Sequence, residues 1–249
     1  MNALHRIIAA ALLSLVALAS PSAHASVVIG GTRVVYPAQD KEVTLKFINE
    51  GERATLVQVW LDDGDDQSTP DTAKAPFVVA PPVFRLDPKK QQTTRIMFTG
   101  AGLPADRETL YWLNMLEIPP KNGTASANIL QFAFRTRIKV FYRPSNLAGE
   151  PVLAYQKLRW TLHTGKDGLV LRADNPTPFH VNFANVSLDV GGQEQGGQGG
   201  QGGGMVAPFS QAEFPLKDLR ARPSGQLKAA VTVINDFGAL VPTEAVLQP

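Results

Sequence analysis

Residues 127–144 read ANILQFAFRTRIKVFYRP, and this stretch decides the fold. Side chains alternate across a strand with a period of two, so the even positions of an extended chain share one face. That face is apolar, with Leu130, Phe132, Phe134, Ile138 and Val140. The opposite face is mostly polar or cationic, with Gln131, Arg135, Arg137 and Lys139. The pattern predicts one long strand that, at a sheet edge, could pair with a foreign chain.

The first 25 residues have the pattern of an export signal. His5 and Arg6 precede the apolar run Ile7–Ala19, which is too short to span a bilayer as a helix. The small residues of Ala23-His24-Ala25 form a cleavage site. We therefore expect residues 1–25 to be a signal peptide that is cleaved. No later stretch is long and apolar enough to cross a membrane, so we expect a mature protein that is not membrane-embedded.

Composition excludes several classes of function. The chain has no cysteine, which rules out thiolate metal sites and thiol nucleophiles and leaves stability to packing. The formal net charge of +2, without a long basic run, gives no sign of nucleic-acid binding. His163 and His180 lie in no catalytic motif, and we interpret both as ordinary surface or packing histidines. We interpret the acidic cluster at 62–66 as a solvated turn, because it lacks the spacing of a calcium loop. We expect no enzyme activity, no metal and no cofactor.

Alternating stretches dominate the mature chain, and helix-period stretches are scarce. Strands are expected at 42–49, 56–61, 95–98, 110–118, 181–190 and 229–234. Many short strands with turn residues between them predict an all-β fold of antiparallel sandwiches. The length suits two sandwiches, 26–145 and 146–249, joined at a loop-like stretch near 145–151. The Gly/Gln-rich segment 191–204 is expected to be a flexible loop or a hairpin insertion.

A series of short motifs resembles those of one protein family, in the family's order. The motifs are GTRVVY at 31–36, APPVFRLDP at 80–88, RETLYWLN at 107–114, EIPP at 117–120, IKVFYRP at 138–144, NPTPF at 175–179 and INDFG at 234–238. Together they resemble the PapD-like periplasmic pilus-assembly chaperones of the chaperone–usher pathway, over essentially the whole mature chain. The resemblance implies two immunoglobulin-like sandwiches in a boomerang arrangement, located in the periplasm.

The resemblance also implies a function in fimbrium biogenesis: the protein would bind pilin subunits and deliver them to an outer-membrane usher, without ATP. A pilin of this pathway is thought to lack its last strand, which leaves an exposed groove and unpaired edges. The chaperone would close the gap with its own strand, by donor-strand complementation. The resemblance assigns the donor side chains to Leu130, Phe132 and Phe134, whereas we expect Ile138 and Val140 to line this protein's own core.

Other site residues follow from the same resemblance. Arg33 and Lys139 match the two cations that hold the C-terminal carboxylate of the subunit. Such an anchor would fix the register, because alternation alone tolerates a slip of two residues. The family's interdomain ionic network matches Glu108, Arg143 and Asp236. The positions implicated in contact with the usher match Pro81, Pro82 and Arg95.

Two departures from the family are visible, and two other functions stay open. The disulfide that many members carry cannot form here, and the Gly/Gln-rich insertion is unusual. The short connection 121–127 resembles the short-loop subclass, which serves rod-like pili. One alternative is a structural or adhesive fimbrial β-sandwich protein, which would have an N-terminal donor segment and usually one incomplete domain. Another is a secreted hydrolase on a β-sandwich. We also expect self-association of the free protein through its exposed strand.

Overall fold

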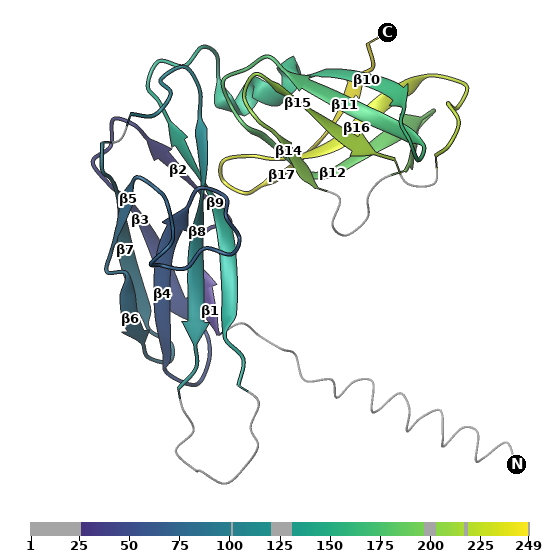
Figure 1. Ribbon diagram of the computed structural model, residues 1–249. Helices are drawn as coiled ribbons and strands as arrows, with labels where there is room; N and C mark the ends of the chain where they lie inside the picture. The colour runs from purple at the N-terminus through teal and green to yellow at the C-terminus, as the bar shows by residue number, and fades with distance from the viewer. Residues whose placement is uncertain (1–25, 101, 121–130, 197–202, 217–218, 249) are drawn as a thin grey trace, which may run out of the picture.

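The computed structural model describes residues 26–100, 102–120, 131–196, 203–216 and 219–248, and these fold as two β-sandwiches in succession (Figure 1). The expected signal peptide, the connection at 121–127 and Leu130 lie outside the described residues. The expectation of an all-β fold is confirmed. No helix in the described ranges is long and apolar enough to cross a membrane.

The first sandwich packs a four-stranded sheet against a five-stranded one. The strand order of the smaller sheet is β1 (Val27–Ile29), β3 (Val43–Asn49), β7 (Gln91–Phe98) and β5 (Phe77–Ala80). The larger sheet has the order β2 (Arg33–Pro37), β9 (Phe134–Arg143), β8 (Thr109–Ile118), β4 (Thr55–Asp62) and β6 (Val83–Leu86). Alternate side chains point inward and build the core, and Phe47, Val57, Leu113 and Val140 are fully buried there.

The second sandwich follows a short 3-10 helix, η1 (Pro151–Lys157), which the sequence patterns did not predict. One sheet has the order β10 (Arg159–Thr164), β11 (Leu169–Asn175) and β15 (Ser210–Pro215). The other contains β13 (Gln193–Gln195), β12 (Val181–Val190), β16 (Leu227–Ile234) and β17 (Leu240–Val246), and β14 (Gly204–Val206) also pairs with β12. Trp160, Leu171 and Leu188 are buried in its separate core.

The Gly/Gln-rich segment is built into this second sandwich at both ends. Residues Gln193–Gln195 form β13, and Gly204–Val206 form β14; both pair antiparallel with β12. Residues 197–202 lie outside the described part of the chain. The described ends of the segment therefore form strands, which fits a hairpin insertion better than a loop along the whole segment.

Strand β9 is paired on both edges along only part of its length. From Lys139 to Tyr142 it lies between β2, which runs parallel to it, and β8, which runs antiparallel, and Arg143 pairs with β2. From Phe134 to Ile138 it pairs with β8 alone among the described strands. The expected long strand is wrong at 131–133, which are not strand. β8 ends at Ile118, and the following Pro119 and Pro120 have no N–H with which to continue the ladder.

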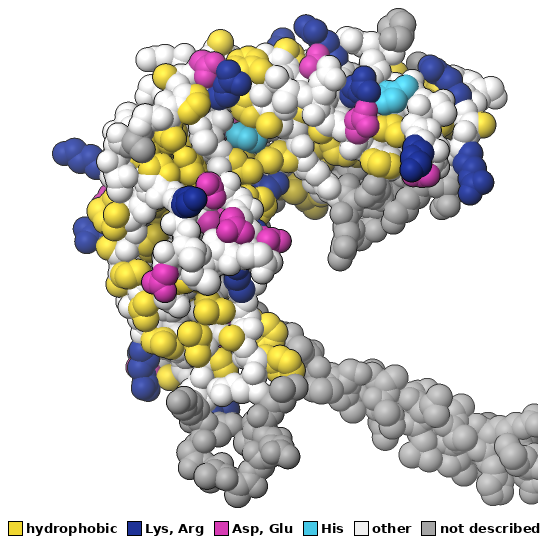
Figure 2. Space-filling view, viewed as in Figure 1, with side chains coloured by type: hydrophobic (Ala, Val, Ile, Leu, Met, Phe, Trp, Pro, Cys, Tyr) yellow, Lys and Arg dark blue, Asp and Glu magenta, His cyan; other side chains and the backbone are white. Residues whose placement is uncertain are grey.

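The two sandwiches are set at an angle, with β9 on the side of the first that faces the second (Figure 1). Figure 2 shows the surface hollowed between them. A backbone hydrogen bond crosses the joint, from Glu108 N–H to the carbonyl oxygen of Pro178 at 2.9 Å. Residues from both sandwiches therefore meet in this interdomain cleft.

Candidate functional site

Two cations project into the interdomain cleft from neighbouring strands. Arg33 of β2 and Lys139 of β9 are register partners, so their side chains lie on the same face of the sheet. Lys139 Nζ donates to Oδ1 of Asn182 at 2.6 Å, and Arg33 Nη1 donates to the carbonyl oxygen of Ile234 at 3.2 Å. Both acceptors belong to the second sandwich. The pair therefore sits where the two domains meet.

The charges of this pair are not balanced by an ion pair within the described part of the chain. Burial, together with the nearby charge of Arg33, lowers the pKa of Lys139 to about 8. Burial also lowers the pKa of Arg33, against the opposing field of Asp236. Within the described residues neither cation has a carboxylate at ion-pair distance, and the buried Nε of Arg33 has no hydrogen-bond acceptor. Two half-buried positive charges without a counter-ion favour an incoming anion, and a carboxylate offers charge-assisted hydrogen bonds to both.

The structure brings Glu108, Arg143 and Asp236 together across the joint. Arg143 Nε donates to Glu108 Oε1 at 2.6 Å, and its Nη1 donates to Asp236 Oδ2 at 2.8 Å. Burial acts to lower the pKa of Arg143, but its bonds to Asp236 and Glu108 outweigh this and raise it. The side chain of Glu108 is 1% exposed. One guanidinium thus joins the first domain to the loop after β16 in the second.

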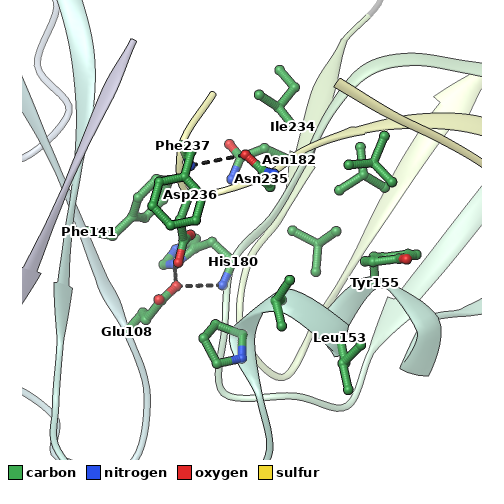
Figure 3. A pocket seen from close by; sticks show the side chains of 15 residues that line it. Glu108, Phe141, Leu153, Tyr155, His180, Asn182, Ile234, Asn235, Asp236 and Phe237 are labelled. Carbon is green, nitrogen blue, oxygen red and sulfur yellow. Dashed lines mark hydrogen bonds and ion pairs between the residues drawn. The ribbon is translucent and has the colours of Figure 1, made fainter. Parts of the chain in front are cut away.

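His180 takes part in the same joint, a role the sequence did not indicate. Its backbone N–H donates to Glu108 Oε2 at 2.7 Å, and its Nδ1 lies 3.1 Å from the same oxygen (Figure 3). The ring also packs against Phe141 of β9, with centroids 5.2 Å apart. The buried carboxylate of Glu108 therefore holds both Arg143 and the start of β12. His163, by contrast, lies 3.4 Å from Glu213 in the second sandwich and is away from the joint.

The apolar face of residues 132–140 is exposed at its start and buried at its end. Phe132 and Phe134 are each 59% exposed, and their ring centroids lie 6.5 Å apart. Ile138 and Val140 are 8% and 0% exposed and belong to this protein's own core, as expected. Leu130 lies outside the described residues. Large exposed aromatic side chains next to an unpaired strand edge are typical of a surface that binds another protein.

The polar face of β9 is held by a buried carboxylate that the sequence analysis did not single out. Asp62 is fully buried, so the interpretation of 62–66 as a solvated turn is wrong at this residue. Its Oδ1 accepts from Arg137 Nη2 at 2.7 Å, and its Oδ2 accepts from Asn114 Nδ2 at 2.6 Å. Burial acts to raise the pKa of Asp62, but hydrogen bonds from Asn114, Gly64 and Ser68 and the charge of Arg137 outweigh it and hold the pKa below its ordinary value.

Arg135 extends this network toward the start of β9. Its Nη2 and Nε donate to Asn114 Oδ1 at 2.7 and 2.9 Å, and its Nη1 donates to the carbonyl oxygen of Asp66 at 2.7 Å. The guanidinium lies 5.0 Å from the ring centroid of Trp60, and that of Arg137 lies 4.9 Å from the centroid of Trp112. These contacts hold residues 134–138, the edge half of β9, against β8 and the loop after β4.

The residues matched to usher contact lie apart from the cleft. Pro81 and Pro82 are exposed between β5 and β6, and Arg95 is exposed on β7. Ala80 pairs directly with Arg95, so Pro81 begins next to it. Arg95 lies 3.6 Å from Glu42, and both side chains are well exposed. The three residues therefore form one exposed patch, where the chain passes from the smaller to the larger sheet of the first sandwich.

Comparison with known proteins identifies the family. Residues 26–148 match the description "Pili and flagellar-assembly chaperone, PapD N-terminal domain", and residues 153–245 match "Pili assembly chaperone PapD, C-terminal domain". The chain is 41% identical over 239 residues to the chaperone protein FimB/FhaD of Bordetella pertussis, covering 94% of this chain and 93% of that protein. It is 40% identical over 226 residues to the probable fimbrial chaperone YadV of Escherichia coli, covering 89% and 90%.

A solved structure gives the same result. The structure of the Salmonella enterica SafA pilin in complex with the SafB chaperone contains a chain 32% identical to this one, with a TM-score of 0.73, covering 91% of this chain and 99% of that one. The chain belongs to the PapD-like pilus-assembly chaperones of the chaperone–usher pathway. Its two domains are immunoglobulin-like, and it is a periplasmic chaperone, not an enzyme. The family resemblance of the sequence motifs is confirmed.

Proposed function

We propose that this chaperone captures a pilin subunit by lending it the edge half of β9, with the subunit's C-terminal carboxylate held between Arg33 and Lys139. The observation that carries the proposal is the pair of register-matched, half-buried cations without a carboxylate partner in the described part of the chain. The related SafB chaperone, solved in complex with a pilin, supports the class of ligand. A chain terminus supplies the one carboxylate that every subunit presents at the end of its last strand.

Apolar contact supplies the second part of the interaction. Phe132 and Phe134 are exposed at alternate positions; Phe134 begins the edge half of β9, and Phe132 lies just before the strand. Burying such a side chain fully in a subunit groove stabilises the complex by about 1.5–3 kcal/mol before ordering costs. Leu130 extends the same alternation by one more step. The two ends of the contact thus have different chemistry: charge in the cleft fixes the register, and the apolar face fills the groove.

The interdomain network and the exposed patch have separate roles in this proposal. Arg143, with Glu108 and Asp236, holds the angle at which the cleft presents its cations. Pro81, Pro82 and Arg95 contact the outer-membrane usher, which receives the loaded complex. The unpaired edge of β9 also allows two copies of the free chaperone to associate in place of a subunit.

The test is co-expression with a pilin subunit from the same pathway and recovery of the complex. Arg33→Ala or Lys139→Ala should reduce recovery at least tenfold, while thermal unfolding shows that each variant is folded. Lys46→Ala, which removes an exposed cation from β3, is the matched control and should leave recovery unchanged. Normal recovery with both cleft variants would rule out the anchor.

A second pair of variants tests strand donation apart from the anchor. Phe132→Asp places a charge in the apolar contact and should reduce recovery, because an unpaired carboxylate is costly to bury in a groove. The control is Val78→Asp on β5, whose native side chain is 49% exposed on the other sheet of the same sandwich. Equal recovery with the two variants would exclude donation through this face.

A further inference from the structure

A pocket of about 180 Å³ opens where the two sandwiches meet (Figure 3). The first sandwich contributes Glu108 and Phe141 to its wall. The rest of the lining comes from η1, from His180 and the start of β12, from the end of β16 and the loop 235–237 after it, and from Val241 of β17. Leu153 and Tyr155 line it from η1, and Phe237, which is 94% exposed, lines it from the loop. The lining is therefore largely apolar.

The pocket directly adjoins the cation pair. Asn182 lines the pocket and accepts the hydrogen bond of Lys139; Ile234 lines it and accepts that of Arg33. Phe141 lies two residues beyond Lys139 on the same face of β9, about 7 Å further toward the joint. A tail that lies along β9 and ends with its carboxylate on the cations therefore has this pocket next to its last side chain.

The size and charge of the pocket select the kind of side chain. A dry cavity of about 150 Å³ lined by aliphatic and aromatic groups holds a benzene ring, so this volume suits one large apolar side chain. The carboxylates at its edge are already engaged, Glu108 by Arg143 and His180 and Asp236 by Arg143. A charged side chain would thus enter without a partner, at a substantial desolvation cost.

We propose that this pocket receives the side chain of the subunit's C-terminal residue and selects aromatic or large aliphatic residues there. The proposal rests on the proposed function, because the carboxylate anchor is what positions the occupant. The chaperone then reads two features of one residue: the cations bind its carboxylate, and the pocket binds its side chain.

The experiment measures calorimetric affinities of the mature chaperone for synthetic peptides. All peptides share one alternating apolar sequence and end in Phe, Leu, Ala or Lys, each as a free acid and as a carboxamide. The acids ending in Phe or Leu should bind about tenfold more tightly than the acid ending in Ala, which is the discrimination that a few methylene groups give in an apolar pocket. The acid ending in Lys should bind no better than the one ending in Ala.

The outcomes separate this proposal from the proposed function. If carboxamides bind as tightly as free acids, the anchor itself is absent. If free acids bind more tightly but the terminal residue has no effect, the anchor stands and the pocket assignment is overturned.

Variants locate the preference in the structure. Leu153→Asp places a carboxylate in the wall and should bring the Phe-to-Ala affinity ratio close to one while improving the peptide that ends in Lys. Val152→Asp, a second wall variant at a 62% exposed residue, should act in the same direction. Leu240→Asp is the control, because Leu240 is also 62% exposed but lies outside the lining. An unchanged ratio in both wall variants would overturn the assignment.

Discussion

Arg33 and Lys139 lie directly opposite one another in the parallel pairing of β2 with β9, so two like charges share one face of the cleft. Such a pair is unfavourable in the unliganded protein, since each charge is partly desolvated and repels the other. In the proposed complex, the carboxylate of the subunit compensates both charges. The arrangement that is unfavourable in the empty chaperone would therefore favour that complex.

Anchoring should depend on pH through Lys139. Its pKa is lowered to about 8, so the charged form is lost as the pH rises past that value. A bound carboxylate favours the charged form, and binding above pH 8 must take up a proton. Affinity for a free-acid peptide should therefore fall by roughly tenfold from pH 7 to pH 9. Calorimetry over this range checks it; Lys139→Arg, which stays charged, should give a flatter profile. An equally steep profile in that variant would assign the titration to another group.

Removing the lysine charge should stabilise the empty protein. The pKa of Lys139 is lower in the folded state than in the unfolded chain, so below pH 8 its protonation opposes folding, and stability rises with pH between about 8 and the ordinary lysine value. Lys139→Met should raise the free energy of unfolding at pH 7 by about 1 kcal/mol, and Tm by roughly 2–4 °C. The difference from wild type should shrink at pH 9.5. A lower Tm for Lys139→Met at pH 7 would contradict this account.

Asp62 should stabilise the edge half of β9. Asp62→Asn keeps the shape of the side chain but removes the charge that pairs with Arg137, at a cost of about 1–3 kcal/mol in unfolding free energy. Amide exchange at 134–138 should become faster. The pKa of Asp62 is lowered in the folded state. Its charge therefore stabilises the fold at pH values above the ordinary aspartate pKa, and this stabilisation is lost as the pH falls through the pKa of the folded state.

A neighbouring carboxylate provides the control for Asp62. Asp63→Asn changes an exposed residue and should alter the stability by less than about 0.5 kcal/mol. Denaturant unfolding measures both variants. Equal, small effects at the two positions would mean that the buried network does not hold the strand.

The two ion pairs of the interdomain network should contribute unequally to the free energy of unfolding. Arg143→Ala leaves Glu108, 1% exposed, without its guanidinium, and should destabilise the protein by about 3–5 kcal/mol. Asp236 is 38% exposed, so Asp236→Asn should cost less than about 1 kcal/mol. Small-angle scattering then reports whether the angle between the sandwiches widens. A larger loss of stability from Asp236→Asn than from Arg143→Ala would reverse the proposed order.

Sequence patterns predicted the strands well where one face is buried and the neighbours are local. Val181–Val190 has the expected bounds, and β3, β8 and β16 differ by one or two residues. The alternation of apolar and polar residues lies within the strand itself, so it can be recognised without knowing the partner strand. The start of β9 was misjudged because it depends on where β8 ends, which Pro119 decides across the ladder and not within the strand itself.

The site could not be found from pattern alone. Glu108, Arg143 and Asp236 are far apart in the sequence, and only the family resemblance suggested that they act together. Asp62 was missed because an acidic turn looks the same whether or not an arginine from another strand covers it. His180 and Asn182 were missed for a related reason: their partners lie in the other domain. Local composition does not encode such cross-domain pairing.

Two imino acids at the end of β8 have a consequence for the donor stretch. β8 ends at Ile118, just before Pro119 and Pro120, and its last pair with β9 is Glu117 with Phe134, so residues 131–133 have no ladder neighbour among the described strands. Within the described part of the chain, no strand covers them. In the function proposed above, the bound subunit supplies the main-chain hydrogen bonds that are missing here.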